Sequence, residues 1–412
     1  MSGLLSSVLL APVAVLALPI GSLFIECVLA FLPKQAALET GDAPSASFSI
    51  LIPAHNEASQ IQSTIADLLP QVPDPSQIVV IADNCTDDTA DLARQQGVTV
   101  IERRNQQQRG KGYALDYGLE FLAQDPPEVV VMVDADCRVE PSTIYRIVAL
   151  SSQTRQPVQS LYLMETPAQP SSKDSISALA FLVKNHVRPE GLLKLKVPCP
   201  LTGTGMAFPW ASLQPISLAS GNIVEDMQLG IDLAIMGYPP RFCPDARVMG
   251  VLPQQEQTAS KQRTRWEHGH LQLILSQAPR LVKAALRQRS WKLFVMALDL
   301  SVPPLSLLAM VWLSMLFLTT LAGIIGLGWQ AAILATIEGV LFLAATFLAW
   351  FKFGQEQVPL KTLLQIPLYI LWKIPLYFKF VSKRQKEWVR TDRDTTVTSQ
   401  VDTAQVGTSE AS

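Results

Sequence analysis

The chain has 412 residues, of which 49% are apolar and only 17% are charged, an unusual balance for a soluble enzyme. Its net charge is -2, and no lysine and arginine cluster is interleaved with aromatic residues along its polar part, which argues against nucleic acid as a partner. Five cysteines lie far apart without the spacing of a metal site or a disulfide framework, as in a reducing compartment: Cys27, Cys85, Cys137, Cys199 and Cys243.

Apolar residues are concentrated in three stretches, each as long as the ~20 residues that cross a bilayer. Glu26 interrupts the first stretch and Glu338 the third. The second and third are joined at residues 326–328, which predicts a hairpin of two spans after a separate N-terminal span. The stretches are Leu4–Leu32, Leu300–Trp329 and Ala331–Trp350.

The first stretch has no basic residue before its long apolar run, which favours a retained membrane anchor over a cleaved signal peptide. Lys34 follows this stretch, and Arg287, Arg289 and Lys292 precede the second. The positive-inside rule then places the middle of the chain in the cytoplasm. We therefore expect an integral protein of the plasma (inner) membrane with a cytoplasmic catalytic domain.

The segment after the hairpin differs from a fourth span. Prolines recur there every eight residues, at Pro359, Pro367 and Pro375, and would break a continuous helix. Lysine-bearing amphipathic helices at the membrane interface fit residues 354–390, and a kinked fourth span is the alternative. Residues 391–412 are rich in Ser, Thr and Asp, which predicts a disordered tail.

The middle of the chain alternates strand-like and helix-like patterns. Residues 48–57 form an apolar strand that breaks at Pro53, and residues 58–69 have helical spacing. A second strand covers Ile78–Ile81, followed by a polar turn and a helix with Thr86 as its cap. This alternation predicts a mainly parallel, doubly wound α/β sheet with its polar turns at one edge, where the active site is expected.

A buried strand ends at two carboxylates in the stretch "VVVMVDADCRVEP". Ligands bind at the carboxyl ends of strands in open α/β sheets, so Asp134 and Asp136 are expected at the mouth of a site. Two carboxylates this close repel each other unless a positive charge lies beside them. A divalent cation is the obvious candidate.

Other polar turns are open to two interpretations. Asp83 and Asn84 are either ordinary turn formers or ligand contacts. The basic loop at residues 109–112 is either a phosphate clamp or solvated, and it lacks the Walker spacing. Glu225 and Asp226 either interact with a helix dipole, or Asp226 is a general base.

Gln262, Arg265 and Trp266 share one face if they lie on a helix. Arg265 could then hold a diphosphate and Trp266 could stack on a sugar ring; the alternative is a basic membrane-proximal helix with an interfacial tryptophan. His268 and His270 do not have the order of a zinc-protease motif, and we expect neither to bind a metal.

Taken in order, seven motifs resemble those of the inverting family 2 glycosyltransferases, in particular the membrane-bound branch with cellulose, chitin-oligosaccharide and hyaluronan synthases and ceramide glucosyltransferase. The resemblance covers about residues 45–290. It implies a GT-A (Rossmann-like) fold, a nucleotide-sugar donor and a divalent cation, Mg or Mn. The motifs are "IPAHNE", "ADNCTDDT", "RGKGYAL", "DAD", "GTGMAF", "VED" and "QRTRW".

The resemblance also implies residue roles. Asp83 would contact the uracil of a UDP-sugar, Asp134 the nucleotide or the metal, and Asp136 the metal that bridges the diphosphate. Lys111 would support the phosphates, and Asp226 would be the catalytic base. Glu57 is placed among the donor-binding residues, and the helix that closes the acceptor pocket and stabilises the leaving diphosphate would carry Gln262, Arg265 and Trp266.

Two departures bear on function. Many relatives have two aspartates in the uracil loop, whereas this chain has Ala82 before Asp83. This difference weakens the prediction that uracil is the nucleotide base of the donor. A translocating synthase of this family usually has more membrane spans, so we expect transfer of only one or a few sugars. The expected acceptor is a membrane-associated lipid or glycan, and the protein is expected to contact membrane lipid. The product would serve cell-envelope or exopolysaccharide synthesis. A processive polysaccharide synthase is the alternative, and a nucleotidyltransferase, an inactive membrane scaffold or a transporter fits less well.

The predicted organisation has five segments. They are an N-terminal anchor (1–33), a cytoplasmic GT-A domain (34–292), a transmembrane hairpin (293–353), interfacial helices (354–390) and a disordered tail (391–412).

Overall fold

The computed structural model of the protein describes residues 2–33, 44–165, 170–219, 224–251, 256–356 and 358–382. The predicted disordered tail, 391–412, lies outside the described residues.

A single eight-stranded sheet forms the centre of the domain, in the order β3-β2-β1-β4-β7-β6-β8-β5. The first four of these strands are parallel, β7 runs antiparallel to β4 and β6, and β6 and β8 are again parallel. The predicted mainly parallel sheet is therefore confirmed. The strands are β1 (Phe48–Ala54), β2 (Ile78–Asp83), β3 (Thr99–Arg103), β4 (Val129–Met132), β5 (Cys137–Val139), β6 (Val158–Glu165), β7 (Met206–Pro209) and β8 (Arg241–Val251).

Helices cover both faces of this sheet because successive strand residues point to opposite sides. Ile50 and Ile52 pack with Ile65 in one core, whereas Leu51 packs with Leu115 in the other. The first face is covered by α2 (Ile61–Leu68) and α5 (Thr143–Thr154), and the second by α4 (Lys111–Leu122) and α9 (Glu225–Ile235). Shorter elements are η1 (Leu69–Gln71), η2 (Pro75–Gln77), α3 (Thr89–Arg94) and α8 (Trp210–Leu213).

Thr86 does not cap the helix that follows β2. Helix α3 begins at Thr89, and its cap position is occupied by Asp88, which makes no side-chain capping bond. The backbone N–H of Thr86 instead donates to Oδ1 of Asn56 at 2.8 Å. The prediction of a Thr86 cap was wrong because this turn is held by a neighbouring loop rather than by the helix.

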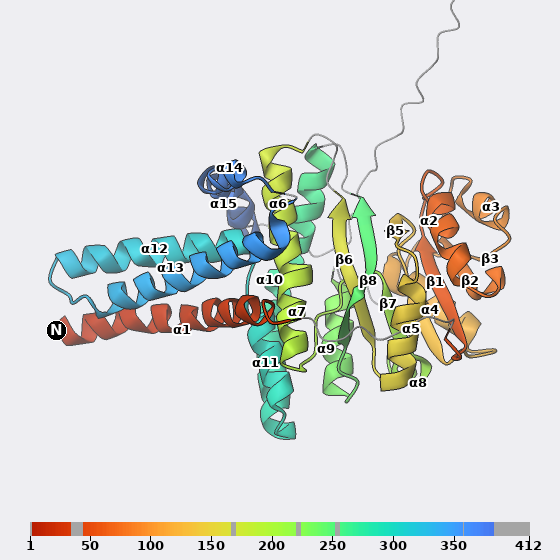
Figure 1. Cartoon of the computed structure of the whole chain (residues 1–412), viewed down its shortest axis with the longest axis horizontal. Coiled ribbons are helices and arrows are strands. Elements are labelled where there is room, and N and C mark those ends of the chain that lie inside the picture. Colours follow the sequence, from red (N-terminus) through yellow and green to blue (C-terminus); the bar gives the residue numbers. More distant parts are fainter. Residues whose placement is uncertain are drawn as a thin grey trace, which may run out of the picture.

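Three long apolar helices extend together from one side of the sheet domain (Figure 1). They are α1 (Ser2–Leu29), α12 (Leu305–Ile324) and α13 (Gln330–Ala349), the last continued by the π-turn η4 (Trp350–Gly354). Among the described residues, three segments are long and apolar enough to cross a membrane: Leu9–Leu29, Leu305–Ile324 and Gln330–Gly354.

The second of these segments starts later than expected. The sequence predicted it from Leu300, but α11 (Trp291–Leu300) ends there and α12 begins only at Leu305, after Pro304. Tandem prolines at 303 and 304 separate the two helices because proline has no N–H to continue a helical ladder.

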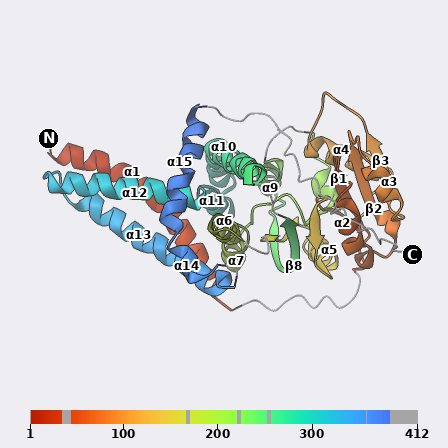
Figure 2. The ribbon, with the colours of Figure 1, turned by 90° about the horizontal axis from the view of Figure 1, so that it is seen from above.

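A layer of helices lies between the apolar helices and the sheet (Figure 2). One of them, α15, crosses the base of the apolar helices and contacts α12. It continues through Pro375, so the expectation that the prolines interrupt every helix here was wrong for this residue. The layer consists of α6 (Ser172–Leu182), the π-turn η3 (Val183–Val187), α7 (Arg188–Lys194), α10 (Glu256–Gln288), α11, α14 (Leu360–Leu363) and α15 (Ile366–Ser382).

Candidate active site

A cavity of about 1350 Å³ runs from the polar edge of the sheet to the apolar helices. Its walls come from the turns after β1, β2 and β4, from the start of α9, from one face of α10 and from α12 and α13. The fold thus brings together all nine residues predicted for the site: Glu57, Asp83, Lys111, Asp134, Asp136, Asp226, Gln262, Arg265 and Trp266.

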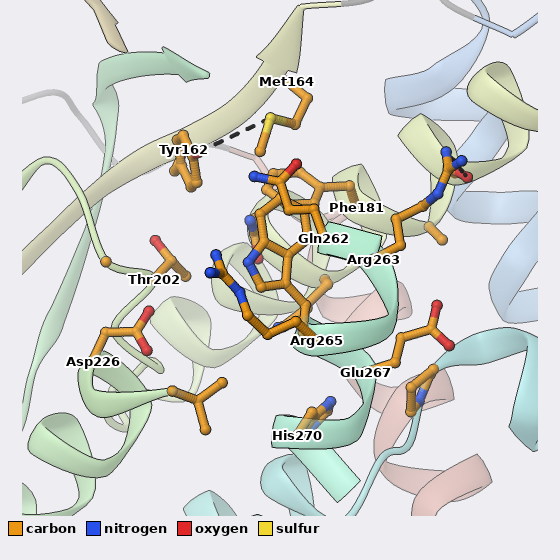
Figure 3. Close-up of a pocket in the computed structure, with 18 of the residues that line it drawn as sticks. Tyr162, Met164, Phe181, Thr202, Asp226, Gln262, Arg263, Arg265, Glu267 and His270 are labelled. Carbon is orange, nitrogen blue, oxygen red and sulfur yellow. Dashed lines mark hydrogen bonds between the residues drawn. The ribbon is translucent and has the colours of Figure 1, made fainter. Parts of the chain in front are cut away.

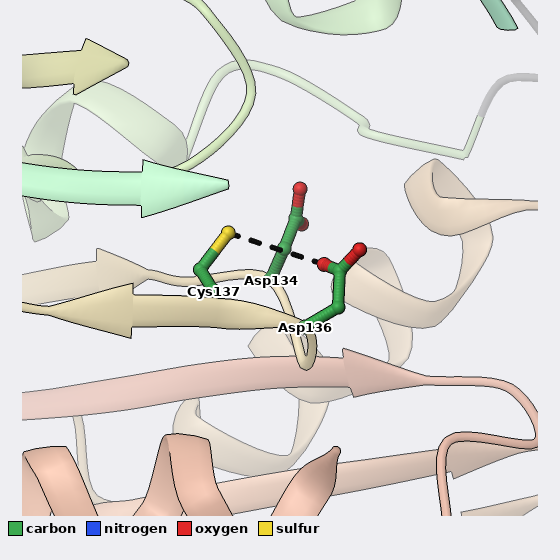
Figure 4. A group of neighbouring side chains, drawn as sticks. All are labelled: Asp134, Asp136 and Cys137. Carbon is green, nitrogen blue, oxygen red and sulfur yellow. Dashed lines mark hydrogen bonds between the residues drawn. The ribbon is translucent and has the colours of Figure 1, made fainter. Parts of the chain in front are cut away.

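The two carboxylates after β4 line this cavity. Ligand atoms of Asp134, Asp136 and Cys137 lie within 4.8 Å of one another, and Figure 4 shows the three side chains grouped beyond the end of the strand. Burial, reinforced by the charge of Asp136, raises the pKa of the Cys137 thiol well above its usual value, so this sulfur stays protonated. The oxygen atoms of Asp134 and Asp136 fit a hard divalent cation, whereas a protonated thiol does not.

Lys111 begins α4 and joins the carboxylates to the opposite wall. It forms an ion pair with Asp134, and its ammonium donates to the carbonyl of Gly203 at 2.6 Å. Burial raises the pKa of Asp134 and the Lys111 charge opposes that rise. The alternative of a solvated loop therefore fails for Lys111, which is 22% exposed, although Arg109 beside it is exposed.

Asp83 ends β2 with its carboxylate already held. Arg103, at the end of the neighbouring strand β3, donates to Oδ1 of Asp83 at 2.8 Å, and the amide of Asn84 donates to the same oxygen at 3.0 Å. The backbone N–H of Glu57 donates to Thr89 Oγ1 at 2.8 Å, which fixes the adjoining turn after β1. Arg103 was not predicted from the sequence. The signal that could have found it is a basic residue at the carboxyl end of a strand whose neighbour in the sheet ends in aspartate.

The start of α9 supplies two acidic groups. Asp226 accepts a hydrogen bond from the Met227 backbone N–H at 2.8 Å through Oδ1. A Cβ at Gly203, whose φ is +94°, would lie 3.1 Å from Oδ2 of Asp226, so only glycine leaves this oxygen open. Burial raises the pKa of Asp226, and burial together with Asp226 raises the pKa of Glu225 to about 7.

Helix α10 places its predicted face on the cavity. In Figure 3 the guanidinium of Arg265 points toward Thr202 and Asp226, and Gln262 lies one turn above it. The Nε atom of Arg265 is buried and has no hydrogen-bond partner among the described residues. The ring of Trp266 packs against Phe181 with centroids 6.0 Å apart, and Phe181 in turn packs against Tyr162 of β6 with centroids 5.5 Å apart, so these rings join α10 to the sheet along the cavity wall.

Other polar and charged groups at the cavity were not foreseen from the sequence. The π-turn η3 contributes Lys184 and Asn185, and Arg188 follows it. A π-turn widens a helix locally and often marks a functional site, but the sequence has no pattern that predicts one. Of the two histidines that we expected not to bind metal, the ring of His268 lies 3.2 Å from the Leu376 carbonyl and His270 is buried.

Comparisons with known proteins agree with this architecture. The sequence model of a family described as "Glycosyltransferase like family 2" matches residues 44–269, more than half of the chain. The chain is 24% identical over 257 residues to "Probable glycosyltransferase YdaM" of Bacillus subtilis, covering 60% of each protein. It is 30% identical over 99 residues to an uncharacterized protein of Methanocaldococcus jannaschii, covering 24% of this chain and 39% of that one.

Among solved structures, the fold resembles that of "Mannosyltransferase PcManGT from Pyrobaculum calidifontis in complex with GDP-Man and Mn2+", with a TM-score of 0.53 at 17% identity. The match covers 93% of this chain and 100% of that one. The expected GT-A fold class is therefore confirmed.

Proposed function

The chain belongs to the glycosyltransferase like family 2, and from this premise we propose that it moves a sugar from a nucleotide-sugar to a membrane lipid or lipid-linked glycan, with inversion of configuration. The active site would lie on the cytoplasmic face of the plasma (inner) membrane. The product would serve the synthesis of the cell envelope or an exopolysaccharide.

The donor would bind over the carboxyl ends of β1, β2 and β4. Asp83, held by Arg103, and Glu57 lie at the end of the cavity farthest from the apolar helices and would contact the nucleotide. The solved mannosyltransferase is in complex with GDP-Man and Mn2+, while the resemblance of the motifs indicates a UDP-sugar. Both nucleotide classes therefore belong in the test.

The carboxylates of Asp134 and Asp136 would hold Mg or Mn. Such a cation, when bound, supplies positive charge that stabilises the leaving diphosphate. Lys111 would keep Asp134 ionised and in place through their ion pair. Arg265, whose Nε has no partner among the described residues, would bind a phosphate oxygen and help to neutralise the leaving group.

Asp226 would act as the general base. Its open Oδ2 would take the proton of the acceptor hydroxyl as that oxygen attacks the anomeric carbon from the face opposite the diphosphate. The new C–O bond forms while the bond to the diphosphate breaks, the electron pair leaves with the nucleotide, and the proton remains on Asp226. The configuration inverts in this single displacement.

The proposal of a membrane-bound acceptor rests on one observation, the continuity of the cavity from the sheet edge to the apolar helices. Apolar residues of α12 and α13 also line the cavity, and two of them, Leu313 and Leu343, are 46% and 58% exposed. A lipid chain could therefore lie between α12 and α13 with its head at Asp226. The apolar lining comprises Leu305, Ala309, Trp312, Leu313, Phe342 and Leu343.

The test is sugar transfer by the purified protein in lipid nanodiscs with Mn and crude membrane lipid, across panels of labelled UDP- and GDP-sugars. We expect one donor to give labelled lipid, and Asp226→Asn to lower kcat by about 10²–10⁴-fold. The matched control is Asp125→Asn, which changes an exposed aspartate of the same domain. Equal activity of Asp226→Asn and wild type would contradict the proposed base, and a long polymer would favour the processive alternative.

A further inference from the structure

Most cations in the membrane half of the cavity are neutralised by carboxylates. The Nε of Arg188 lies 2.8 Å from Glu26, and a second nitrogen lies 2.5 Å from Asp299. Each of these side chains is at most 7% exposed, so their charges satisfy one another away from water. Arg263, which also lines the cavity, is paired with Asp174 at 3.6 Å, and the lining carboxylate Glu267 is paired with Lys373.

Lys184, like Arg265, forms no ion pair with a described residue, and the catalytic carboxylate that acts on its charge is Asp226. Lys184 lines the cavity from η3. Burial lowers the pKa of Lys184, and Asp226 is the first group that raises it again. Glu225 adds a second carboxyl beside Asp226. The charge of Lys184 is thus balanced by Asp226, and Arg265 would be occupied by the donor diphosphate, so no cavity-lining cation among the described residues of this half is left over for an anionic head group.

The uncharged polar groups in this half of the cavity also favour an uncharged acceptor. Asn185 is 4% exposed, lines the cavity, and its Oδ1 has no hydrogen-bond partner among the described residues. The buried hydroxyl of Thr202, on the same cavity, is likewise unpartnered within the described part of the chain. An amide and a hydroxyl both donate and accept hydrogen bonds, so they match another hydroxyl or amide. A phosphate at neutral pH mainly accepts.

The proposed role of Asp226 as the general base favours the same kind of acceptor. A lipid hydroxyl must lose a proton to become a nucleophile, which requires a base at the site. The oxygen of a lipid phosphate is already anionic at neutral pH, needs no base, and would be repelled by an ionised Asp226. The carboxylate of Asp226, in a pocket whose other charges are balanced, therefore favours an uncharged alcohol as the acceptor.

From these contacts we infer that the acceptor is an uncharged lipid with a free hydroxyl group, not a lipid phosphate. This inference rests on the proposed function and narrows its acceptor. The lipid chain would lie along Leu313 and Leu343, and the hydroxyl would lie between Asp226 and Asn185.

The chemical class of the product tests this inference even while the lipid itself is unidentified. Labelled lipid made by the wild-type protein in nanodiscs from crude membrane lipid is passed over an anion exchanger and then heated in mild acid. We expect the label to pass through the exchanger and to survive the acid, as a neutral glycoside does. Label that is retained by the exchanger, or that the acid releases from the lipid as free sugar or glycosyl phosphate, would overturn the inference while leaving the proposed transferase intact.

Matched acceptors sharpen the test. A long-chain prenol and the corresponding prenyl phosphate share one chain and differ only in the head group. Transfer to the prenol, or to diacylglycerol as a second uncharged alcohol, at a rate at least about tenfold above the phosphate is the expected result. Transfer to the phosphate at an equal or higher rate would overturn the inference. If no donor labels any lipid, the proposed function itself fails.

A variant separates binding of the alcohol from folding. Asn185→Leu should raise the apparent KM for the lipid alcohol about tenfold, because it removes one buried hydrogen bond, and should leave the KM for the donor unchanged. An unchanged acceptor KM in a variant that still binds donor would contradict the role of Asn185. The product-class measurement on wild type stands even if this variant does not fold.

Discussion

Two adjacent carboxyl groups at the start of α9 have pKa values above the ordinary carboxylate range. The pKa of Glu225 is raised to about 7 by burial and by Asp226, and the pKa of Asp226 is raised by burial. Lys111 opposes both shifts. Because the two groups interact, they titrate as a pair, and the proton that each carries depends on the other.

This pair predicts the pH dependence of the reaction. Asp226 accepts a proton only when ionised, so kcat/KM should be full above the raised pKa of the pair and fall as the pH is lowered through it. Glu225→Gln removes a neighbouring negative charge and should move this acid limb to lower pH by about one unit. A pH–rate profile of both proteins checks this, and identical acid limbs would contradict the coupling.

The carboxylates of Asp134 and Asp136 after β4 are predicted to bind a divalent cation. Asp136→Asn should weaken binding of Mn by about tenfold or more, because one of two anionic ligands is lost. Titration of the purified protein with Mn, followed by electron paramagnetic resonance of the free ion, measures this without any turnover. The Asp125→Asn control should retain wild-type affinity, and equal affinity of Asp136→Asn would exclude this residue as a ligand.

At the scale of elements, one buried arginine joins three helices. Arg188 at the start of α7 binds Glu26 of α1 and Asp299 of α11, and its second nitrogen also donates to the Asp299 carbonyl at 2.6 Å. Burial lowers the pKa of Arg188, but the two carboxylates outweigh it and raise the pKa above its usual value. The first apolar helix is thereby fixed to the layer that carries Lys184 and Asn185.

Breaking this contact should destabilise the junction. Arg188→Met leaves two buried carboxylates uncompensated, which costs about 3–5 kcal/mol, and should lower the midpoint of thermal unfolding in nanodiscs. The triple variant with Glu26→Gln, Asp299→Asn and Arg188→Met removes all three charges and should recover most of the loss. A triple variant no more stable than Arg188→Met would show that packing rather than charge holds the helices together.

For the whole molecule, the decisive feature is that one cavity joins the sheet edge to the apolar helices. Leu313→Trp should narrow the cavity between α12 and α13, raise the KM for the lipid acceptor about tenfold, and leave the KM for the donor unchanged. Leu318→Trp is a matched control, since Leu318 has the same exposure, 46%, on the same helix and does not line the cavity. Equal effects of the two variants would argue against entry of the lipid between these helices.

Much of this architecture could be predicted because its signals are local. The apolar runs of β1, β2 and β4, the carboxylates that follow them, and the three long apolar stretches each lie within a short window of sequence. Burial of a strand and the length of a span depend on that window alone, so periodicity and composition reveal them. The order of the motifs along the chain then resembled that of a family, and a family model confirmed it.

The tertiary structure decided what depends on residues far apart in the chain. Arg103 holds Asp83, Lys111 reaches Gly203, and Glu26 meets Arg188 only after folding. The local sequence around a charged residue does not reveal which distant residue it will pair with. A π-turn and a continuous cavity likewise have no recurring sequence pattern. The sequence by itself therefore determined the fold class, the apolar helices and the chemical groups of the site, whereas long-range packing decided the balance of charge in the acceptor half of the cavity.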